Sequence, residues 1–163
     1  MEAMKGKGRL LDAVGGLPTL EKVHKIFYDK IYAHPWIGQF FMGHNQSSIE
    51  KRQTRFMAGK MGGDLPYFGR EMKMAHRQMF ITEELFGLRS RLLREALEEA
   101  GVPMALAKRW LKIDSAFKRQ IVKESIQSFY AWTWQYEKRV IIPKPTGLDL
   151  FSMHHISKRV WDY

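Results

Sequence analysis

His76 is the side chain in this sequence best suited to ligate a metal, because it stands among methionines at helical spacing. Met72, His76 and Met79 would share one face of a short helix. An imidazole there can bind a metal through one ring nitrogen. No His, Asp or Glu lies four residues away, which argues against tetrahedral zinc. Iron with one axial protein ligand, as in haem, is compatible, although the residues alone favour an ordinary half-buried histidine.

Two further polar side chains sit on apolar stripes. Gln53 shares a helical face with Ile49, Phe56 and Met57, and Tyr28 follows a phenylalanine on an earlier helix. A buried amide without a hydrogen-bond partner costs about 1–3 kcal/mol, so Gln53 must bond either to its own surroundings or to a polar ligand. The same two interpretations apply to the hydroxyl of Tyr28.

Arg89 is the third candidate, because it lies on the inner stripe of a helix otherwise made of leucine and alanine. Its stem could cover apolar surface while its head reaches water. Alternatively, its charge meets a carboxylate or a bound ligand. The sequence favours neither.

The elements that position these residues are helices almost throughout. Pro18 suits a first helical turn, and the His34-Pro35 step ends the helix that follows. Ser47 and Glu50 form a capping-box pattern, and Thr82 is an expected N-cap. The predicted helices cover 20–31, 47–60, 72–79, 83–100 and 103–138, with a turn at 36–41, a loop at Gly62-Gly63 and Pro66, and one short helix at 150–160 in the tail.

Composition sets outer limits on function. The 163 residues fit one domain, and their 45% hydrophobic content is ordinary for a folded one. The absence of cysteine excludes disulfides and thiolate metal sites, and fits a cytoplasmic protein. No apolar stretch is long enough for a membrane helix, and the first 14 residues do not form a signal peptide. The net charge of +10 raises the prior for a polyanionic partner, but no basic run or recognition helix supports nucleic-acid binding.

Read in chain order, these features resemble the truncated (two-over-two) haemoglobins, most closely group I. The resemblance spans about residues 10–125. It rests on a series of short motifs: Gly15-Gly16, Phe27-Tyr28, Pro35, Phe40-Phe41, Gln53 with Phe56, Gly62-Gly63, Tyr67, Gly69, Met72 with Ala75-His76, Ile81-Thr82, Phe86 and Gly101-Val102-Pro103. It implies an all-α, two-over-two globin sandwich with a C-terminal extension: a haem domain over 1–140 and a tail over 141–163.

The resemblance assigns roles around haem b. His76 matches the proximal histidine that binds iron. Tyr28 and Gln53 match the distal pair that donates hydrogen bonds to bound ligand, and so would carry catalysis. The remaining positions match residues that line the cofactor, contact a propionate or line a tunnel: Phe41, Ile49, Arg52, Phe56, Met57, Met72, Phe86 and Arg89. The second ring nitrogen of the proximal histidine is expected to meet a carbonyl or water.

The implied function is reversible binding of dioxygen, nitric oxide and carbon monoxide. The expected chemistry is conversion of nitric oxide to nitrate by ferrous-oxy haem. No flavin or nicotinamide motif is apparent, so an external reductase would be the partner. Two alternatives remain open: a non-enzymatic gas sensor or carrier, and a haem-free basic helical binding domain.

Arg89 departs from the family pattern, in which its position is usually apolar or Trp. The tail is aromatic and basic and contains His154-His155; it is either a strap, a disordered end or a docking segment. His24, His34 and His44 are expected on the surface.

Overall fold

The computed structural model describes residues 9–64, 72–134 and 137–148. The helices within these residues are α2 (Leu10–Val14), α3 (Leu17–Ala33), the 3₁₀ helix η1 (Ile37–Phe41), α4 (Gln46–Lys60), α5 (Met72–His76), α6 (Glu83–Glu99), α7 (Met104–Ser115), α8 (Lys118–Ile121) and α9 (Ile126–Trp132). The predicted all-α class is confirmed. In the described part of the chain, β pairing is limited to one isolated bridge between Met79 and Val140.

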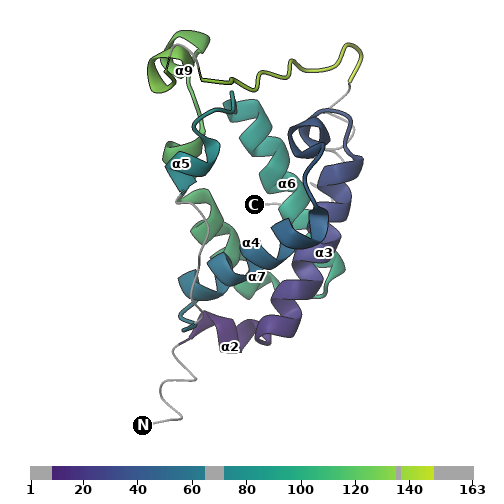
Figure 1. The fold of residues 1–163 in the computed structure, drawn as a ribbon. Helices are drawn as coiled ribbons and strands as arrows, with labels where there is room; N and C mark the ends of the chain where they lie inside the picture. The colour runs from purple at the N-terminus through teal and green to yellow at the C-terminus, as the bar shows by residue number, and fades with distance from the viewer. Residues whose placement is uncertain (1–8, 65–71, 135–136, 149–163) are drawn as a thin grey trace.

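Two pairs of helices form the body of the molecule. Helix α3 packs against α4 and α6, and α6 packs against α7 (Figure 1). The interior side chains of α3, α6 and α7 are almost fully excluded from solvent, including Phe27, Leu88 and Trp110. Burial of such aromatic and leucine side chains is the main force that holds the layers together.

Glycines make the sharp connections at both ends of this core. Gly15, between α2 and α3, has a φ of 112°, and Gly62, after α4, has a φ of 97°. Both angles lie in the region that favours glycine. Gly63 has a different constraint: a Cβ there would lie 2.9 Å from the carbonyl oxygen of Ala58 and from Leu11 Cδ2. The predicted double-glycine turns are therefore confirmed.

Helix α4 begins two residues earlier than the capping-box pattern predicts. Asn45 is the N-cap, and its side chain accepts a hydrogen bond from the main-chain N–H of Ser48 at 2.9 Å. The side chain of Gln46 then donates to Asp29 on α3 and to Glu50. These contacts hold the extra residues in the first turn. At α6 the prediction is confirmed, since Thr82 caps the helix by accepting from Leu85 N–H.

The single helix expected over 103–138 is wrong. Helix α7 ends at Ser115, and two shorter helices follow. Val122, after α8, is extended, and the main-chain N–H of Lys123 donates to the carbonyl of Ile81 rather than to a helical partner. Ser125 then caps α9 by accepting from Ser128 N–H. The chain breaks here because these tertiary and capping bonds replace the helical ones.

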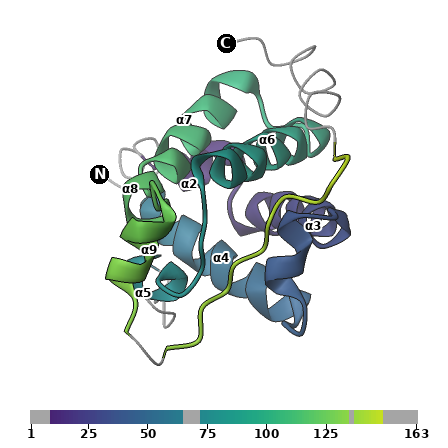
Figure 2. The same ribbon diagram turned by 90° about the horizontal axis from the view of Figure 1, so that it is seen from above.

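The predicted helix over 72–79 is also shorter than expected, since α5 ends at His76. Met79 pairs instead with Val140, Phe80 N–H donates to the Val140 carbonyl, and Val140 N–H donates to the carbonyl of Gln78. We call residues 137–148 the strap. It runs from the α5–α9 side across the molecule towards α3 and α6 (Figure 2), and Trp36 Nε1 donates to the carbonyl of Ile142 at 2.8 Å.

Several expectations lie outside the described residues: the loop residue Pro66, Tyr67 and Gly69, the tail helix at 150–160, and His154-His155. In the part of the chain that the structure describes, no helix combines the length and apolarity required to cross a bilayer.

Candidate functional site

His76, at the end of α5, is arranged as a neutral ligand. Its Nδ1 lies 2.8 Å from the main-chain oxygen of Met72. A carbonyl only accepts hydrogen bonds, so Nδ1 carries the proton and Nε2 keeps its lone pair. Burial lowers the pKa of His76, against the opposing hydrogen bond to Met72. The ring is therefore uncharged at neutral pH, which is the state that binds a metal.

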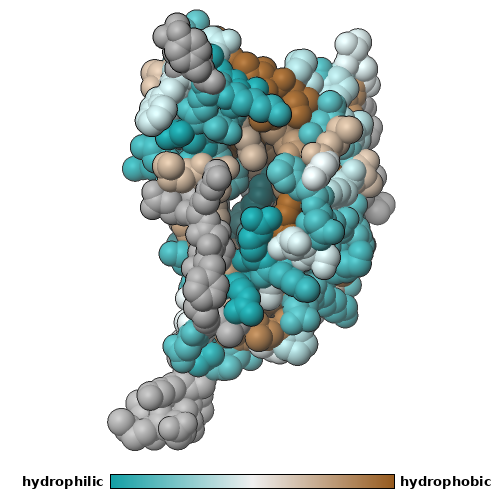
Figure 3. Space-filling view, viewed as in Figure 1, coloured by the Kyte–Doolittle hydropathy of each residue, from teal (hydrophilic) through white to brown (hydrophobic). Residues whose placement is uncertain are grey.

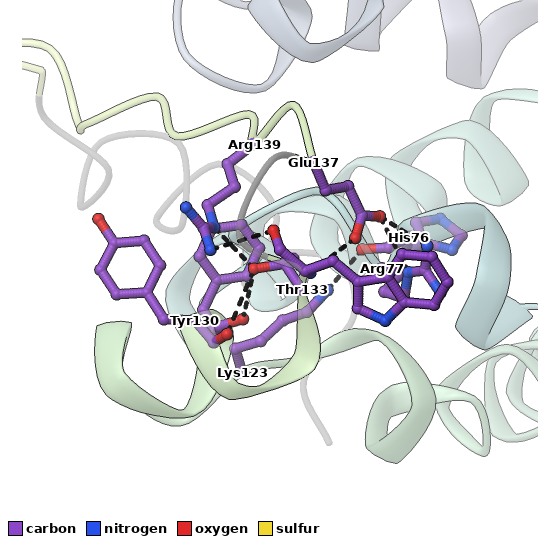
Figure 4. A network of polar contacts seen from close by, with 9 residues as sticks. His76, Arg77, Lys123, Tyr130, Thr133, Glu137 and Arg139 are labelled. Carbon is purple, nitrogen blue, oxygen red and sulfur yellow. Dashed lines mark hydrogen bonds and ion pairs between the residues drawn. The ribbon is translucent and has the colours of Figure 1, made fainter.

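The segment between α8 and α9 reaches the main chain of His76. Lys123 Nζ donates to the His76 carbonyl at 2.5 Å (Figure 4), and this lysine is only 2% exposed. Its ammonium also lies 5.1 Å from the centroid of Trp132 and 5.8 Å from that of Phe129. Cation–π attraction partly replaces the lost hydration of such a buried charge.

A second group of polar contacts ties the strap to the same region. Arg77 forms an ion pair with Glu137, with Nη2 and Oε1 2.7 Å apart, and Arg139 Nε donates to Thr133 Oγ1 at 2.6 Å (Figure 4). The main-chain N–H of Trp134, together with Arg77, holds the pKa of Glu137 at about 2. The residue that follows His76 is thus anchored to the strap.

Tyr28 lies in the interior among aromatic rings. Its ring makes edge contacts with Phe27 at 4.8 Å and with Phe41 at 6.0 Å between centroids. Burial raises the pKa of the phenol to about 12, and the positive charge of Arg89 opposes that rise. The hydroxyl therefore stays protonated across the physiological range and is available as a hydrogen-bond donor.

Arg89 meets a carboxylate, one of the two interpretations left open by the sequence. Its Nη1 lies 2.5 Å from Asp114 Oδ2 on α7. The guanidinium carbon also lies 5.1 Å from the centroid of Phe27. Burial disfavours the charged guanidinium, but the charge of Asp114 and the hydrogen bonds with Asp114 and Tyr28 together outweigh burial and raise the pKa of Arg89.

The expectation that His24 and His34 lie on the surface is wrong, whereas His44 is exposed as expected. His24 is 1% exposed, and its Nδ1 is 2.7 Å from Thr54 Oγ1 on α4. Burial, and then the charge of Arg89, lower the pKa of His24 to about 3, so it is neutral. His34 is also buried; its Nδ1 accepts from Trp36 N–H and caps the start of η1.

Of the candidate residues of α4, some are buried in the interior and others are partly or fully exposed. Met57 is fully buried, Ile49 packs against the core, and Gln53 is half-buried. Phe56 contacts Phe117, with ring centroids 5.1 Å apart. Arg52 is exposed, where its charge is available to a group at the protein surface.

The remaining candidates come from three other elements. Phe41, in η1, is partly buried against the core, Phe86 of α6 is 5% exposed, and Met72 of α5 is half-buried. The surface is hollowed near its centre, and hydrophobic residues lie beside the hollow (Figure 3). A neutral imidazole whose Nε2 keeps its lone pair, a protonated phenol and apolar walls are the chemistry that haem and a small gas require, so these residues fit the cofactor.

Two contributors to the site were missed by sequence reasoning. Asp114 is spaced four residues from Trp110, which identifies it as a carboxylate on an inner helical face. The spacing in the sequence was therefore sufficient to suggest Asp114 as a partner for a buried cation. Lys123 had no such local signal, because its partners come from α5 and α9 and the helix was expected to continue through it.

A hollowed two-over-two helical sandwich that presents His76 as a neutral metal ligand has the architecture of a truncated globin. The chain belongs to the bacterial-like globin family, whose family model matches residues 9–123. Membership in this family implies a haem iron and diatomic gas ligands.

Similar proteins confirm the resemblance to group I. The chain is 38% identical over 94 residues to the Group 1 truncated hemoglobin GlbN of Mycolicibacterium paratuberculosis, covering 58% of this chain and 69% of that relative. The truncated hemoglobin of Tetrahymena pyriformis in its Fe(III) form superposes with a TM-score of 0.67 at 24% identity, over 71% of this chain and 99% of that one. The hemoglobin of Chloroflexus aurantiacus superposes with a TM-score of 0.64 at 22% identity, over 71% and 98%.

Proposed function

We propose that this chain binds haem b through His76 Nε2 and uses it to convert nitric oxide and dioxygen to nitrate. The observation that carries the proposal is the hydrogen bond from His76 Nδ1 to the Met72 carbonyl. This bond fixes the tautomer and orients the ring, as it does for metal-ligating histidines in general. The haem supplies the iron at which diatomic gases bind.

The residues of the chain have separate tasks in this function. Tyr28 would donate a hydrogen bond from its phenolic O–H to a gas bound at the haem, with Gln53 as the second donor from α4. Five apolar residues would exclude water from the cofactor: Phe41, Ile49, Met57, Met72 and Phe86. Arg52, which is exposed, would contact a haem propionate. Phe56 borders the route by which gas enters. A hydrogen bond of this kind contributes about 1–3 kcal/mol to ligand retention.

The overall reaction combines one nitric oxide, one dioxygen and one electron to give one nitrate ion. The electron comes from a reductase partner, and we propose that the reaction takes place in the cytoplasm. A carrier or sensor would bind the same gases but show no turnover with a reductase supplied.

Haemin titration of the purified protein tests the proposal. The wild type should develop an intense haem band, and His76→Ala should lose or shift it, with added imidazole restoring the band. His44→Ala is the matched control, because His44 is exposed. If the wild type takes up no haem, or if His76→Ala leaves the spectrum unchanged, the assignment of His76 is wrong.

In the haem-loaded protein, Tyr28→Phe tests the distal donor. This change removes only the hydroxyl, so dioxygen should leave about tenfold faster or more, since 1.4 kcal/mol corresponds to a factor of ten. Stopped-flow release rates give the answer, and nitrate production should fall in parallel. Equal release rates in the two proteins would remove Tyr28 from the proposal.

A further inference from the structure

A pocket of about 530 Å³ lies in the groove between α6 and α7, which pack side by side (Figure 2). Small-molecule sites have volumes of roughly 300–1,000 Å³, so the pocket has the size of such a site. Its polar lining consists of two cations and one serine from each helix: Arg91, Arg94 and Ser90 of α6, and Lys108, Lys112 and Ser115 of α7. The described lining contains no acidic side chain and none of the candidate haem residues.

The cations of the pocket lie at spacings that bring like charges together. Arg91 and Arg94 are three residues apart on α6, and Lys108 and Lys112 are four residues apart on α7. Side chains at these spacings are neighbours on one helical face, where like charges are destabilising. Burial lowers the pKa of Arg91, and the positive charge of Arg94 lowers it further. The fold therefore concentrates positive charge in a groove where an anion would neutralise it.

Arg91 differs from the other partly buried arginines in its hydrogen bonding. Arg77 and Arg89 each contact a carboxylate. Nη1 of Arg91 is buried, and no acceptor among the described residues lies within hydrogen-bonding distance of it. Glu95, one turn further along α6, opposes the lowering of the pKa of Arg91, but its Oε1 lies 3.4 Å from Lys30 Nζ on α3. A buried donor without a partner is costly, so a ligand with several acceptor oxygens would stabilise this side chain.

We propose that the groove between α6 and α7 binds a small molecule that carries two or more phosphate groups. An arginine can bind a phosphate through two parallel N–H donors, and a lysine binds it as a point charge, so two pairs of cations suit two phosphates. The hydroxyls of Ser90 and Ser115 add a neutral donor from each helix. A soluble polyphosphate and the headgroup of a diphosphate lipid share this chemistry.

Inorganic tripolyphosphate is the first probe, and calorimetric titration of the full chain gives its dissociation constant. An ionic strength of about 0.15 M shortens the screening length to about 8 Å and so suppresses diffuse attraction to the positive net charge. The double variant Arg91→Gln/Lys112→Gln removes one cation from each helix. It should weaken binding by about tenfold or more, because each removed cation is a charged hydrogen-bond donor.

The matched control is Lys51→Gln/Arg55→Gln, which removes two exposed cations from α4 and lowers the net charge by the same amount. It should bind tripolyphosphate as the wild type does. Lys112→Glu changes one exposed position only, so it provides a second test if Arg91→Gln/Lys112→Gln does not fold. Reversal of this charge should also weaken binding by about tenfold or more.

Vesicles of phosphatidylcholine with and without cardiolipin are the second probe, because cardiolipin carries two phosphates. Binding of tripolyphosphate that is weakened in the groove variants would assign the site to a soluble ligand. Cosedimentation with cardiolipin vesicles alone, lost in the groove variants, would assign it to a lipid headgroup. If the wild type binds neither probe, or if the α4 control loses as much affinity as the groove variants, the site is overturned. The haem proposal is unaffected by either result, because no candidate haem residue lines the groove.

Discussion

Lys123 donates a hydrogen bond from its buried ammonium to the main-chain oxygen of His76, across 47 residues of sequence. Lys123 lies in the segment between α8 and α9, and His76 is the last residue of α5. The same ammonium lies over the ring of Trp132. The position of the candidate iron ligand therefore depends on the last residue matched by the globin family model and, through the ring over its ammonium, on Trp132 beyond that region.

Because the ammonium of Lys123 is buried, the free energy of unfolding should vary with pH in the alkaline range. Burial lowers the pKa of Lys123 from its ordinary 10.5 to about 8. Between those values the unfolded chain binds the extra proton and the folded chain does not, so the contribution of Lys123 to stability rises with pH. Lys123→Met fills the same space without titrating. Urea unfolding at pH 7.5 to 10.5 should show wild type gaining on the variant by at most about 1.4 kcal/mol per pH unit. Parallel curves would show that the pKa of Lys123 is the same in the folded and unfolded chains, and would contradict the prediction.

His24 should make the free energy of unfolding fall as the solution becomes acidic. Its pKa is lowered to about 3, so the unfolded chain takes up a proton near pH 6.5 while the folded chain does not. The contribution is present above pH 6.5 and is lost as pH falls towards 3. Relative to His24→Gln, the wild type should lose about 1.4 kcal/mol per pH unit between pH 6 and 4 in urea unfolding. His44→Gln is the control, and an identical slope in His24→Gln would contradict the prediction.

Two glycine-to-alanine changes should act in opposite directions. In Gly63→Ala the new methyl would lie 2.9 Å from the Ala58 carbonyl oxygen, so the turn after α4 must shift and stability should fall. Gly87, inside α6, has open space around its Cβ position, and alanine there should add about 0.5–1 kcal/mol through helix propensity. Thermal unfolding of both variants provides the measurement. If Gly63→Ala stabilised the protein, the turn after α4 would accommodate the methyl group without strain, and the prediction would be wrong.

The parts of the fold that could be predicted from sequence are those set by local signals. Thr82 as a cap, Pro18 in a first turn and the glycine pairs act within a few residues, and the structure confirms each of them. Asn45 and Ser47 are both residue types that favour the N-cap position, so local patterns allow α4 to begin at either of two places. The choice between them depends on contacts from Gln46 to α3, which local patterns do not contain.

The site was predictable only in part for the same reason. Stripe positions and the family resemblance identify His76, Tyr28 and Arg89 as candidates, but a single sequence does not state which carboxylate meets an arginine. Asp114 is 25 residues away on the next helix. The break after Ser115 is equally non-local, because the chain leaves its helical path to bond with Ile81 and His76.

The strap has a consequence for the order of assembly during synthesis. A chain emerges from the ribosome N-terminus first, and long-range contacts form only when both partners are present. Helices α3, α6 and α7 can pack once residue 115 has emerged, but Val140 must arrive before it can pair with Met79, and Ile142 before it can bind Trp36. The region around α5 is thus completed only after residue 142 has emerged, later than the contacts among α3, α6 and α7.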